Sequence, residues 1–521
     1  MLGGRGFLGR GIAAAFGGAW TLAVLSSSSA APVEIQNLPQ AQATAHADPA
    51  LFAAAYHAIR SHYIEPLTSD GLAMAGLQNA MALDPTLSIA REGDRVVFRQ
   101  WHNVLLDVPA PGTEDNQGWG WVTASVLDRA KQYSPDIAAK SEDALDETVI
   151  DGGLKLLDRF SRYAAPRLAT ERRDNRDGYG GIGVTLDGEG PSVRIAMVLP
   201  DSPAAAAGLS GGDHITAVDG ISAVQMAAEG IAERLRGPVG SELRLTVLRD
   251  GGTYPVTVTL RRSHIVMKTV SMSHDDHVAV FRIASFNART ADNLEEQLAA
   301  AHREMGSELR GLVLDLRGNP GGLVDQSVLV ASLFLESGRI VSTKGRVPES
   351  NQVFDVTRDR PAETLPLVVL VNGGSASASE IVASALQDDH RAVIVGTSSY
   401  GKGTVQDVIH LPNQGELTVT WAKLIPPGNY ILHHHGVVPV VCTANLVSVN
   451  DAEPIPGLPR SALDDHGWDA LRAQCPASRI DRNVDLEVAK RLLIDPRRYA
   501  QALADEPTRP FQAASISTTV R

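Results

Sequence analysis

The stretch LPLVVLVNGGSASASEIVASALQDD (residues 365–389) leads from a short apolar run, through a turn of glycine and serine, into a helical pattern. A continuous apolar run of this length is typical of a strand that is buried on both faces, as in a parallel sheet. Ser375, Ser377 and Ser379 follow where that strand would end, and α/β sheets place their sites at the carboxyl ends of strands. The stretch therefore predicts an α/β layer, with either a mounted nucleophile or a serine-rich turn that merely opens a helix.

Further strand and helix patterns surround this stretch. Apolar runs at residues 278–286, 309–316 and 391–396 alternate with helical patterns such as the one at 290–305. Apolar strands that are separated by helices indicate an α/β fold. We expect this α/β domain to span residues 263–445.

A serine hydroxyl needs a neighbouring base before it can act as a nucleophile. None of the 15 histidines stands in a recognisable catalytic pattern, and we expect HHH (433–435) to be solvated in a loop. HExxH, GxSxG and cysteine–histidine metal spacings are absent from the sequence, so we expect no metal and no cofactor. The remaining candidate base is Lys402 in SSYGKGTVQ (398–406), which follows an apolar run. If the two strands are parallel neighbours, the loops that carry Ser377 and Lys402 meet at one edge of the sheet.

The order and spacing of four motifs resemble those of the carboxyl-terminal processing (tail-specific) serine proteases along almost the whole chain. The motifs are LDRFSRYAAP (157–166), DLRGNPGG (315–322), NGGSASASEIVASALQD (372–388) and GTSSYGKGTVQ (396–406). The resemblance implies that Ser377 is the nucleophile, that Lys402 is its base and that Gln406 orients the lysine. Glu380 and Asp388 match further polar positions of the family motif, and we expect them to have a structural role.

The chemistry of these residues agrees with the implied roles. Lys402 accepts a proton only when it is neutral, so its pKa has to lie well below the usual value of about 10.4. Burial lowers the pKa of a lysine because it disfavours the ammonium form. Gln406 can hydrogen-bond an amine without adding charge, whereas a carboxylate would hold the proton on Lys402.

An acyl-transfer site also needs donors for the oxyanion. GNPGG (318–322) follows an apolar run, and we expect the backbone N–H of Gly321 to be free there. The N–H of Ala378, next to the nucleophile at a helix start, is the expected second donor. The alternative for GNPGG is a tight turn without a catalytic role.

Residues 179–262 resemble a PDZ domain, because short β-branched runs alternate there with glycines and end in a hairpin with an Asp-Gly-Gly turn. GYGGIGV (178–184) would form the carboxylate cradle, in which the N–H groups of Gly181, Ile182 and Gly183 face a chain terminus. The strand after the cradle would pair with an extended peptide. The alternative is a PDZ-like fold that packs against the protease and binds nothing free.

The amino terminus has the order of a secretory signal peptide over residues 1–31: two arginines, an apolar stretch and then small residues. An uncleaved anchor is the alternative. We therefore expect an exported protein of the periplasm or cell envelope. Cys442 and Cys475 either form a disulfide in that oxidising compartment or remain two buried thiols, and we predict the disulfide.

Two further regions flank the recognisable domains. Residues 48–178 are expected to be mainly helical, with an irregular insertion at about 87–145 that has no clear family counterpart. Residues 446–521 are expected to form a proline-rich, irregular extension with one helix. A second departure from the family pattern is Val440, where the family has an acidic residue.

Composition and charge narrow the function. The chain has 521 residues, so two to four domains are expected, and its net charge of −13 without a long basic run excludes nucleic acid as a partner. The resemblance, together with the signal-like amino terminus, implies a multidomain α/β protein that is an exported serine endopeptidase. We expect it to cleave proteins near their free C-termini through an acyl-enzyme intermediate. The PDZ domain would recognise the substrate or regulate the protease. The sequence does not decide whether an adaptor protein takes part. The alternative is a PDZ scaffold with a vestigial protease fold, which the intact set Ser377, Lys402 and Gln406 disfavours.

Overall fold

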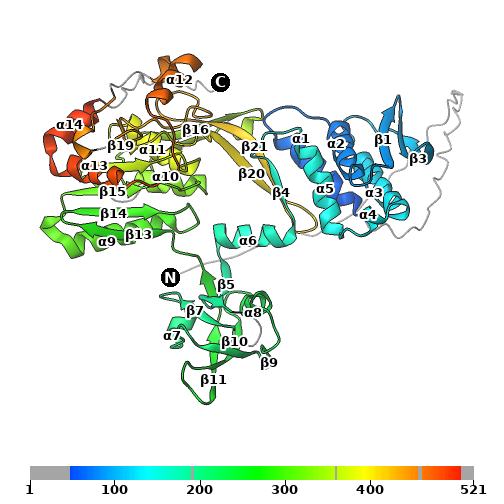
Figure 1. Ribbon diagram of the computed structural model, residues 1–521, viewed down its shortest axis with the longest axis horizontal. Coiled ribbons are helices and arrows are strands. Elements are labelled where there is room, and N and C mark those ends of the chain that lie inside the picture. Colours follow the sequence, from blue (N-terminus) through cyan, green and yellow to red (C-terminus); the bar gives the residue numbers. More distant parts are fainter. Residues whose placement is uncertain (1–46, 189–192, 358–360, 447, 456–459, 506–521) are drawn as a thin grey trace, which may run out of the picture. The chain divides into compact units, whose positions relative to one another are not determined.

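The computed structural model describes residues 47–188, 193–357, 361–446, 448–455 and 460–505. The expected signal peptide therefore lies outside the described residues. None of the helices in the described ranges is long and apolar enough to cross a membrane. The described chain contains a helical amino-terminal region, a small β domain, an α/β domain and a carboxyl-terminal extension (Figure 1).

The amino-terminal region is mainly helical, as its sequence predicts. Asp48, Thr68 and Asp115 precede three of its helices and accept hydrogen bonds from backbone N–H groups of the first turn, which stabilises the helix starts. Gly76 allows two helices to approach closely, because a Cβ there would lie 2.5 Å from the carbonyl oxygen of Val149. The helices are α1 (Pro49–His62), α2 (Ser69–Met81), α3 (Asn116–Tyr133), α4 (Pro135–Ala138) and α5 (Glu142–Leu154).

The insertion at residues 87–145 is ordered, which corrects the expectation of an irregular segment. Its first half is an antiparallel sheet in which Val96 and Phe98 are buried against the helices, and its second half contains α3 and α4. The sheet consists of β1 (Leu87–Glu92), β2 (Arg95–Gln100) and β3 (Asn103–Pro109).

The small β domain has its apolar core between one sheet and two short helices. The strand order is β11-β10-β8-β7-β6, with β9 paired to β8, so that β6 lies at an edge of the sheet. The predicted hairpin is present, since β10 pairs with β11 in the register Leu248↔Pro255. The elements are β6 (Val184–Asp187), β7 (Arg194–Val198), α7 (Pro203–Ala206), β8 (His214–Val218), β9 (Ile221–Ser222), α8 (Ala228–Leu235), β10 (Glu242–Leu248) and β11 (Pro255–Arg261).

Two segments connect the small domain to the rest of the chain. Helix α6 (Pro166–Asp177) precedes the domain. Strand β5 (Tyr179–Gly181) at its beginning pairs with β12 (Ser263–Ile265) at its end, so both boundaries close on one two-stranded ladder.

The α/β domain contains a six-stranded sheet with the order β13-β14-β15-β18-β19-β22. All neighbours in it are parallel except β13 and β14. Side chains of β18 alternate between two cores. Val369 packs with α9, α10 and α11, whereas Val368 and Leu370 pack with α13 (Asn483–Ile494) and α14 (Pro496–Ala504). The strand is therefore buried on both faces, as predicted. The strands are β13 (Val270–Asp275), β14 (Val278–Ile283), β15 (Gly311–Asp315), β18 (Leu367–Val371), β19 (Val393–Gly396) and β22 (Val441–Cys442), and the first three helices are α9 (Thr290–Met305), α10 (Val324–Ser332) and α11 (Ala378–Asp388).

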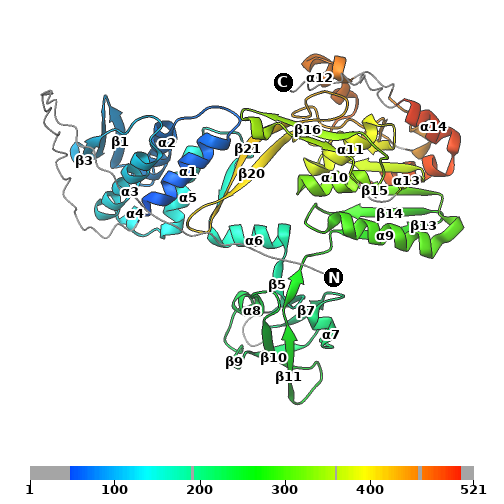
Figure 2. The ribbon, with the colours of Figure 1, turned by 180° about the vertical axis from the view of Figure 1, so that it is seen from behind.

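A second, antiparallel sheet combines strands that precede the nucleophile segment in the chain with strands that follow it. Its order is β17-β16-β21-β20, and the short strand β4 also pairs with β21. The long strands β20 and β21 run side by side, which both views show (Figures 1 and 2). The strands are β4 (Arg162–Ala164), β16 (Arg339–Gly345), β17 (Val353–Asp355), β20 (Thr404–His410) and β21 (Glu416–Ile425).

The carboxyl-terminal extension is more ordered than its sequence suggested, because three helices form in place of the single one expected. Trp468 of the first helix is buried, and Cys475 at its end is bonded to Cys442 of β22. The disulfide prediction is thus confirmed. The helices are α12 (Asp465–Gln474), α13 (Asn483–Ile494) and α14 (Pro496–Ala504).

Candidate active site

Ser377 lies where β18 has ended and α11 begins. Its backbone angles, φ 56° and ψ −115°, are rarely adopted by residues other than glycine, so the surrounding structure has to hold the serine there. Ser375 and Ser379 help to fix this turn, because their buried hydroxyl groups donate hydrogen bonds to the carbonyl oxygens of Leu316 and Asn319. The three alternating serines thus have different roles. Ser375 and Ser379 anchor the turn to the loop after β15, and Ser377 between them is the candidate nucleophile.

Glu380 connects the nucleophile turn to the loop that carries Lys402. Its carboxylate is fully buried, and Oε2 accepts hydrogen bonds from the backbone N–H of Ser377 at 2.8 Å and of Lys402 at 2.9 Å. Oε1 accepts from the Gly401 N–H at 2.7 Å and from the Ser399 hydroxyl. Burial raises the pKa of Glu380, and the four hydrogen bonds to the carboxylate oppose that rise. One side chain therefore fixes the two candidate catalytic residues relative to each other.

Lys402 has the electrostatic setting of a general base. Burial, and to a smaller extent the nearby guanidinium of Arg162, lower its pKa from 10.5 to about 8, against the opposing charges of Glu380 and Asp158. Its Nζ atom lies 5.4 Å from the centre of the Phe160 ring. At pH 7 about one Lys402 in eleven would be neutral, compared with about one in three thousand at the ordinary pKa.

No hydrogen bond joins the side chains of Ser377, Lys402 and Gln406 within the part of the chain that the structure describes. Among the described residues, no hydrogen bond joins the Ser377 hydroxyl to the Lys402 amine. Gln406 does not contact the lysine either: its Nε2 donates to the hydroxyl groups of Thr404 at 2.9 Å and Thr420 at 3.1 Å. The register of β20 and β21 shifts at Gln406, which places its amide between these threonines. The expectation that Gln406 orients Lys402 is therefore not met in this conformation.

The expected oxyanion donors behave differently. The Ala378 N–H stands in the first turn of α11 and has no acceptor within the described residues, so it can serve an anion. Gly321 lies against the nucleophile, since a Cβ there would come within 2.9 Å of the Ser377 Cβ. Its N–H, however, donates to Oδ1 of Asn319 at 2.8 Å. The expectation of a free Gly321 N–H is thus wrong for this conformation, because the asparagine side chain caps it.

The histidine run is not fully solvated, which corrects another expectation. His433 is half-buried, its Nδ1 is enclosed without a hydrogen-bond partner among the described residues, and its ring meets Phe160 edge-on at 6.0 Å. Burial and the nearby His434 and Lys423 lower its pKa to about 4, so it is neutral at pH 7. His433 therefore stands beside the same phenylalanine as Lys402.

The carboxyl-terminal extension forms hydrogen bonds with the nucleophile turn. The Gly373 N–H in the nucleophile turn donates to the Ser478 carbonyl at 2.6 Å, and the Asn372 side chain donates to Asp481 at 2.9 Å. The Asn372 Oδ1 in turn accepts from the Gly318 N–H at 2.9 Å, which ties the GNPGG loop to the nucleophile turn. Val440, where the family pattern has an acidic residue, is buried just before β22 and takes no part in these contacts.

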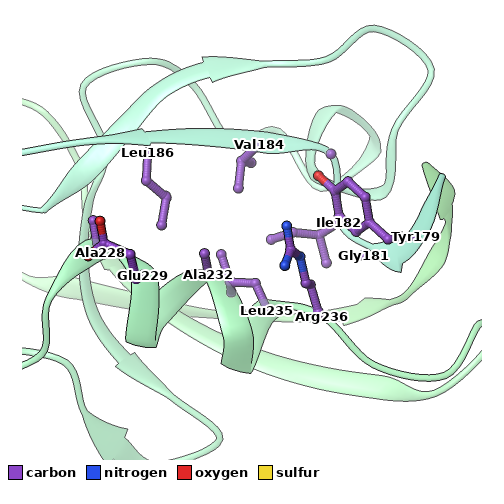
Figure 3. Close-up of a pocket in the computed structure, with 11 residues that line it drawn as sticks. Tyr179, Gly181, Ile182, Val184, Leu186, Ala228, Glu229, Ala232, Leu235 and Arg236 are labelled. Atoms are coloured by element: carbon purple, nitrogen blue, oxygen red, sulfur yellow. The ribbon is translucent and has the colours of Figure 1, made fainter. Parts of the chain in front are cut away.

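The β domain carries a groove between β6 and α8 with a volume of about 270 Å³ (Figure 3). Gly181, Ile182 and Gly183 all line it, as predicted from GYGGIGV. Within the described chain the N–H groups of Ile182 and Gly183 have no acceptor, whereas Gly181 belongs to the β5–β12 ladder. Gly183 has φ +77° and would place a Cβ 2.3 Å from the Ser202 Cβ, so only glycine fits there.

Sequence reasoning missed several residues that shape the site. Glu380 was assigned only structural support, although it bonds both candidate catalytic residues; its place three residues after Ser377, as in a capping box, was the available signal. Asn372 and the extension near Ser478 had no signal in the sequence, because their contacts join segments that are about a hundred residues apart. Asp388 has the structural role expected of it, accepting from the Gly428 N–H at 2.8 Å.

Comparison with known proteins agrees with this geometry. The family model described as "Peptidase family S41" matches residues 277–441, and the model described as "PDZ domain" matches residues 172–248. A carboxy-terminal-processing protease of Bartonella bacilliformis is 36% identical over 305 residues, which cover 58% of this chain and 70% of that protein. A carboxyl-terminal-processing protease of Synechocystis sp. is 36% identical over 303 residues, which cover 56% of this chain and 69% of that protein.

A solved structure of a photosystem II D1 C-terminal processing protease is also similar, with 24% identity and a TM-score of 0.38 over 75% of this chain and 92% of that one. The two sequence relatives decide the assignment, because the matched region exceeds two thirds of each of them. The chain therefore belongs to peptidase family S41 and is a C-terminal processing serine protease with a PDZ domain.

Proposed function

We propose that this protease is exported and cleaves polypeptides near their free C-termini through a dyad of Ser377 and Lys402. The observation that carries the proposal is the shared carboxylate of Glu380, which binds the backbone of both residues while burial lowers the pKa of Lys402 to about 8. A base with that pKa is available at neutral pH, and a nucleophile at the start of a helix has the Ala378 N–H beside it.

The chemistry follows from these positions. The Ser377 oxygen attacks the carbonyl carbon of the scissile peptide while neutral Lys402 takes the hydroxyl proton. The oxyanion accepts from the Ala378 N–H, and the ammonium of Lys402 then returns its proton to the leaving amine. Water repeats the sequence on the acyl-enzyme and frees the serine. Proton transfer requires a hydrogen bond between the hydroxyl and the amine, and such catalytic hydrogen bonds often form only when substrate is bound.

The PDZ groove would bind the C-terminus of the substrate. The N–H groups of Ile182 and Gly183, which have no acceptor among the described residues, suit a terminal carboxylate. Strand β6, at an edge of the sheet as far as the structure describes it, suits an extended peptide. Export rests on the signal-like sequence of residues 1–31, and the disulfide between Cys442 and Cys475 favours an oxidising compartment.

The proposal is tested by mass spectrometry of the fragments that the purified full chain releases from a denatured protein substrate. Wild type should release C-terminal fragments, whereas Ser377→Ala and Lys402→Ala should release none while still unfolding cooperatively on heating, as folded proteins do. Lys344→Ala, which removes an exposed lysine from β16, is the matched control and should cleave normally. Substantial cleavage by Lys402→Ala would show that another group is the base.

The same assay tests the role of Gln406 and also distinguishes an active protease from a vestigial PDZ scaffold. Because Gln406 contacts two threonines and not the lysine, Gln406→Ala should keep measurable activity. A wild-type chain that cleaves nothing but binds free C-termini would instead establish the PDZ scaffold.

A further inference from the structure

The motif LDRFSRYAAP, which the dyad does not explain, places unpaired arginine beside the candidate base. Arg159 stacks on two rings: its Cζ lies 4.9 Å from the centre of Phe160 and 5.4 Å from the centre of Tyr400. Arg479, from the carboxyl-terminal extension, lies on Tyr400 at 5.6 Å. We call Arg159, Arg479, Phe160 and Tyr400 the arginine–aromatic cluster.

The cluster adjoins the catalytic residues directly. Phe160 is the ring that Lys402 approaches at 5.4 Å, and Tyr400 precedes Lys402 by two residues. His433 also contacts Phe160, since the centres of the two rings lie 6.0 Å apart. Residues from four distant parts of the chain thus meet around the base.

The guanidinium groups of the cluster have no anion of their own. Neither Arg159 nor Arg479 forms an ion pair or a side-chain hydrogen bond with any residue that the structure describes, although the chain has 60 acidic residues against 47 basic ones. Both side chains are exposed to solvent. A guanidinium that stacks on a ring keeps its N–H edge free and loses little further freedom when it binds a carboxylate, which it can do through two parallel hydrogen bonds.

Arg159 and Arg479 are not explained by an effect on the pKa of Lys402 or by pairing with Glu380. The pKa of Lys402 is lowered by burial and by Arg162, and Arg159 and Arg479 are not among the causes. Glu380, the carboxylate that binds the catalytic loops, is fully buried and has all its hydrogen bonds made. Asp158, which also acts on Lys402, accepts from the backbone N–H groups of Phe160 and Ser161 and forms no ion pair with either arginine among the described residues. A carboxylate from outside the described chain can therefore pair with the cluster.

We propose that the arginine–aromatic cluster binds a carboxylate of the substrate next to the scissile bond. The proposal rests on the proposed function, because it takes Lys402 to mark the place of cleavage. The carboxylate is either the terminal one of the substrate or a Glu or Asp side chain close to the cleaved bond. The cluster would thereby set how far from the C-terminus, or beside which residue, the enzyme cuts.

The test compares kcat/KM within two pairs of peptides built around a mapped cleavage site. The first pair ends a few residues after that site as a free acid or as an amide, and the second pair is amidated and carries Glu or Gln beside it. Wild type should prefer the charged member of at least one pair about tenfold, in line with hydrogen bonds to a charged group. The pair that shows the preference identifies the source of the carboxylate. The preference should shrink when ionic strength rises from about 0.1 M to about 1 M, because the sites are exposed.

Variants locate the preference in the molecule. Arg159→Met and Arg479→Met keep the stacking length and remove the charge, so each should bring the ratio close to one, whereas Arg303→Met, an exposed arginine of α9, should leave it unchanged. Ala232→Glu places a repelling charge in the PDZ groove; a preference that this change abolishes, and that Arg159→Met does not, belongs to the PDZ domain and overturns the proposal. A ratio near one for both pairs in wild type overturns it as well.

Binding to an inactive chain gives the same answer without turnover. In Ser377→Ala combined with Ala232→Glu, the charged peptide should bind about tenfold more tightly than its neutral partner, and adding Arg159→Met should remove the difference. Equal binding of both peptides contradicts the cluster even if the dyad is correct. Conversely, cleavage by Lys402→Ala with an intact charge preference refutes the dyad and leaves the carboxylate site standing.

Discussion

The substitution Glu380→Gln removes one charge from the centre of the site and keeps the shape of the side chain. Glu380 accepts from four donors, two at each oxygen, and among them are the N–H groups of Ser377 and Lys402. A glutamine has only one oxygen, so its NH₂ group must face two of these donors. If the oxygen stays with Ser377 and Lys402, the Ser399 hydroxyl can turn to accept from the NH₂, but the buried Gly401 N–H loses its acceptor.

The magnitude follows from that orphaned group. A buried donor without a partner costs about 1 to 3 kcal/mol, and the surviving hydrogen bonds lose the contribution of the charge. If the lost hydrogen bond misaligns the loop of Lys402 and raises the activation free energy by this amount, the plateau of kcat/KM should fall about ten- to a hundredfold. The pKa read from the pH dependence of kcat/KM should fall, although the variant is less active. Because the Glu380 carboxylate raises the pKa of Lys402, its removal should shift the inflection below about 8.

The assay is kcat/KM for a cleavable peptide between about pH 6 and pH 10, together with thermal unfolding to confirm that the variant is folded. The expected signature is a lower plateau reached at a lower pH. Glu304→Gln, an exposed position on α9, is the control and should match wild type in both respects. A Glu380→Gln enzyme with a wild-type plateau, or with an inflection moved to higher pH, would refute the reasoning.

The remaining predictions concern stability and binding. Lys402 has the lower pKa when the protein is folded, so stability falls as pH drops from 10.5 to about 8, and the full penalty is present at pH 7, where the lysine is mostly protonated in both states. Lys402→Met should therefore be inactive yet about 3 kcal/mol more stable than wild type at pH 7 in urea unfolding, an advantage that should vanish near pH 10.5. Opening the disulfide between Cys442 and Cys475, which are 33 residues apart, should lower the unfolding free energy by about 4 kcal/mol, and a melting temperature that reductant leaves unchanged would contradict this. Ala232→Glu should weaken binding of a fluorescent free-acid peptide to the PDZ groove while wild type discriminates against the amide; equal affinity of wild type for acid and amide would reject the carboxylate cradle.

Local patterns in the sequence predicted the parallel strand before Ser377, the helix after it and the parallel neighbour that leads to Lys402. These features depend on residues that are close together in the chain, so periodicity and turn composition express them directly. The PDZ groove was predictable for the same reason, because Gly181, Ile182 and Gly183 form one continuous turn. The insertion and the extension were underestimated, since short elements that are buried by distant partners leave only weak periodicity.

The sequence by itself determined the family, the α/β and PDZ domains, and which serine and lysine to consider. Only the tertiary structure decided how they are held. The bond from one Glu380 oxygen to two loops, the capping of the Gly321 N–H by Asn319 and the threonine partners of Gln406 all depend on the final positions of side chains. The arginine–aromatic cluster likewise joins segments more than three hundred residues apart. Such contacts form when the packed core fixes the distance between segments, and that distance is not encoded in any stretch of sequence taken alone.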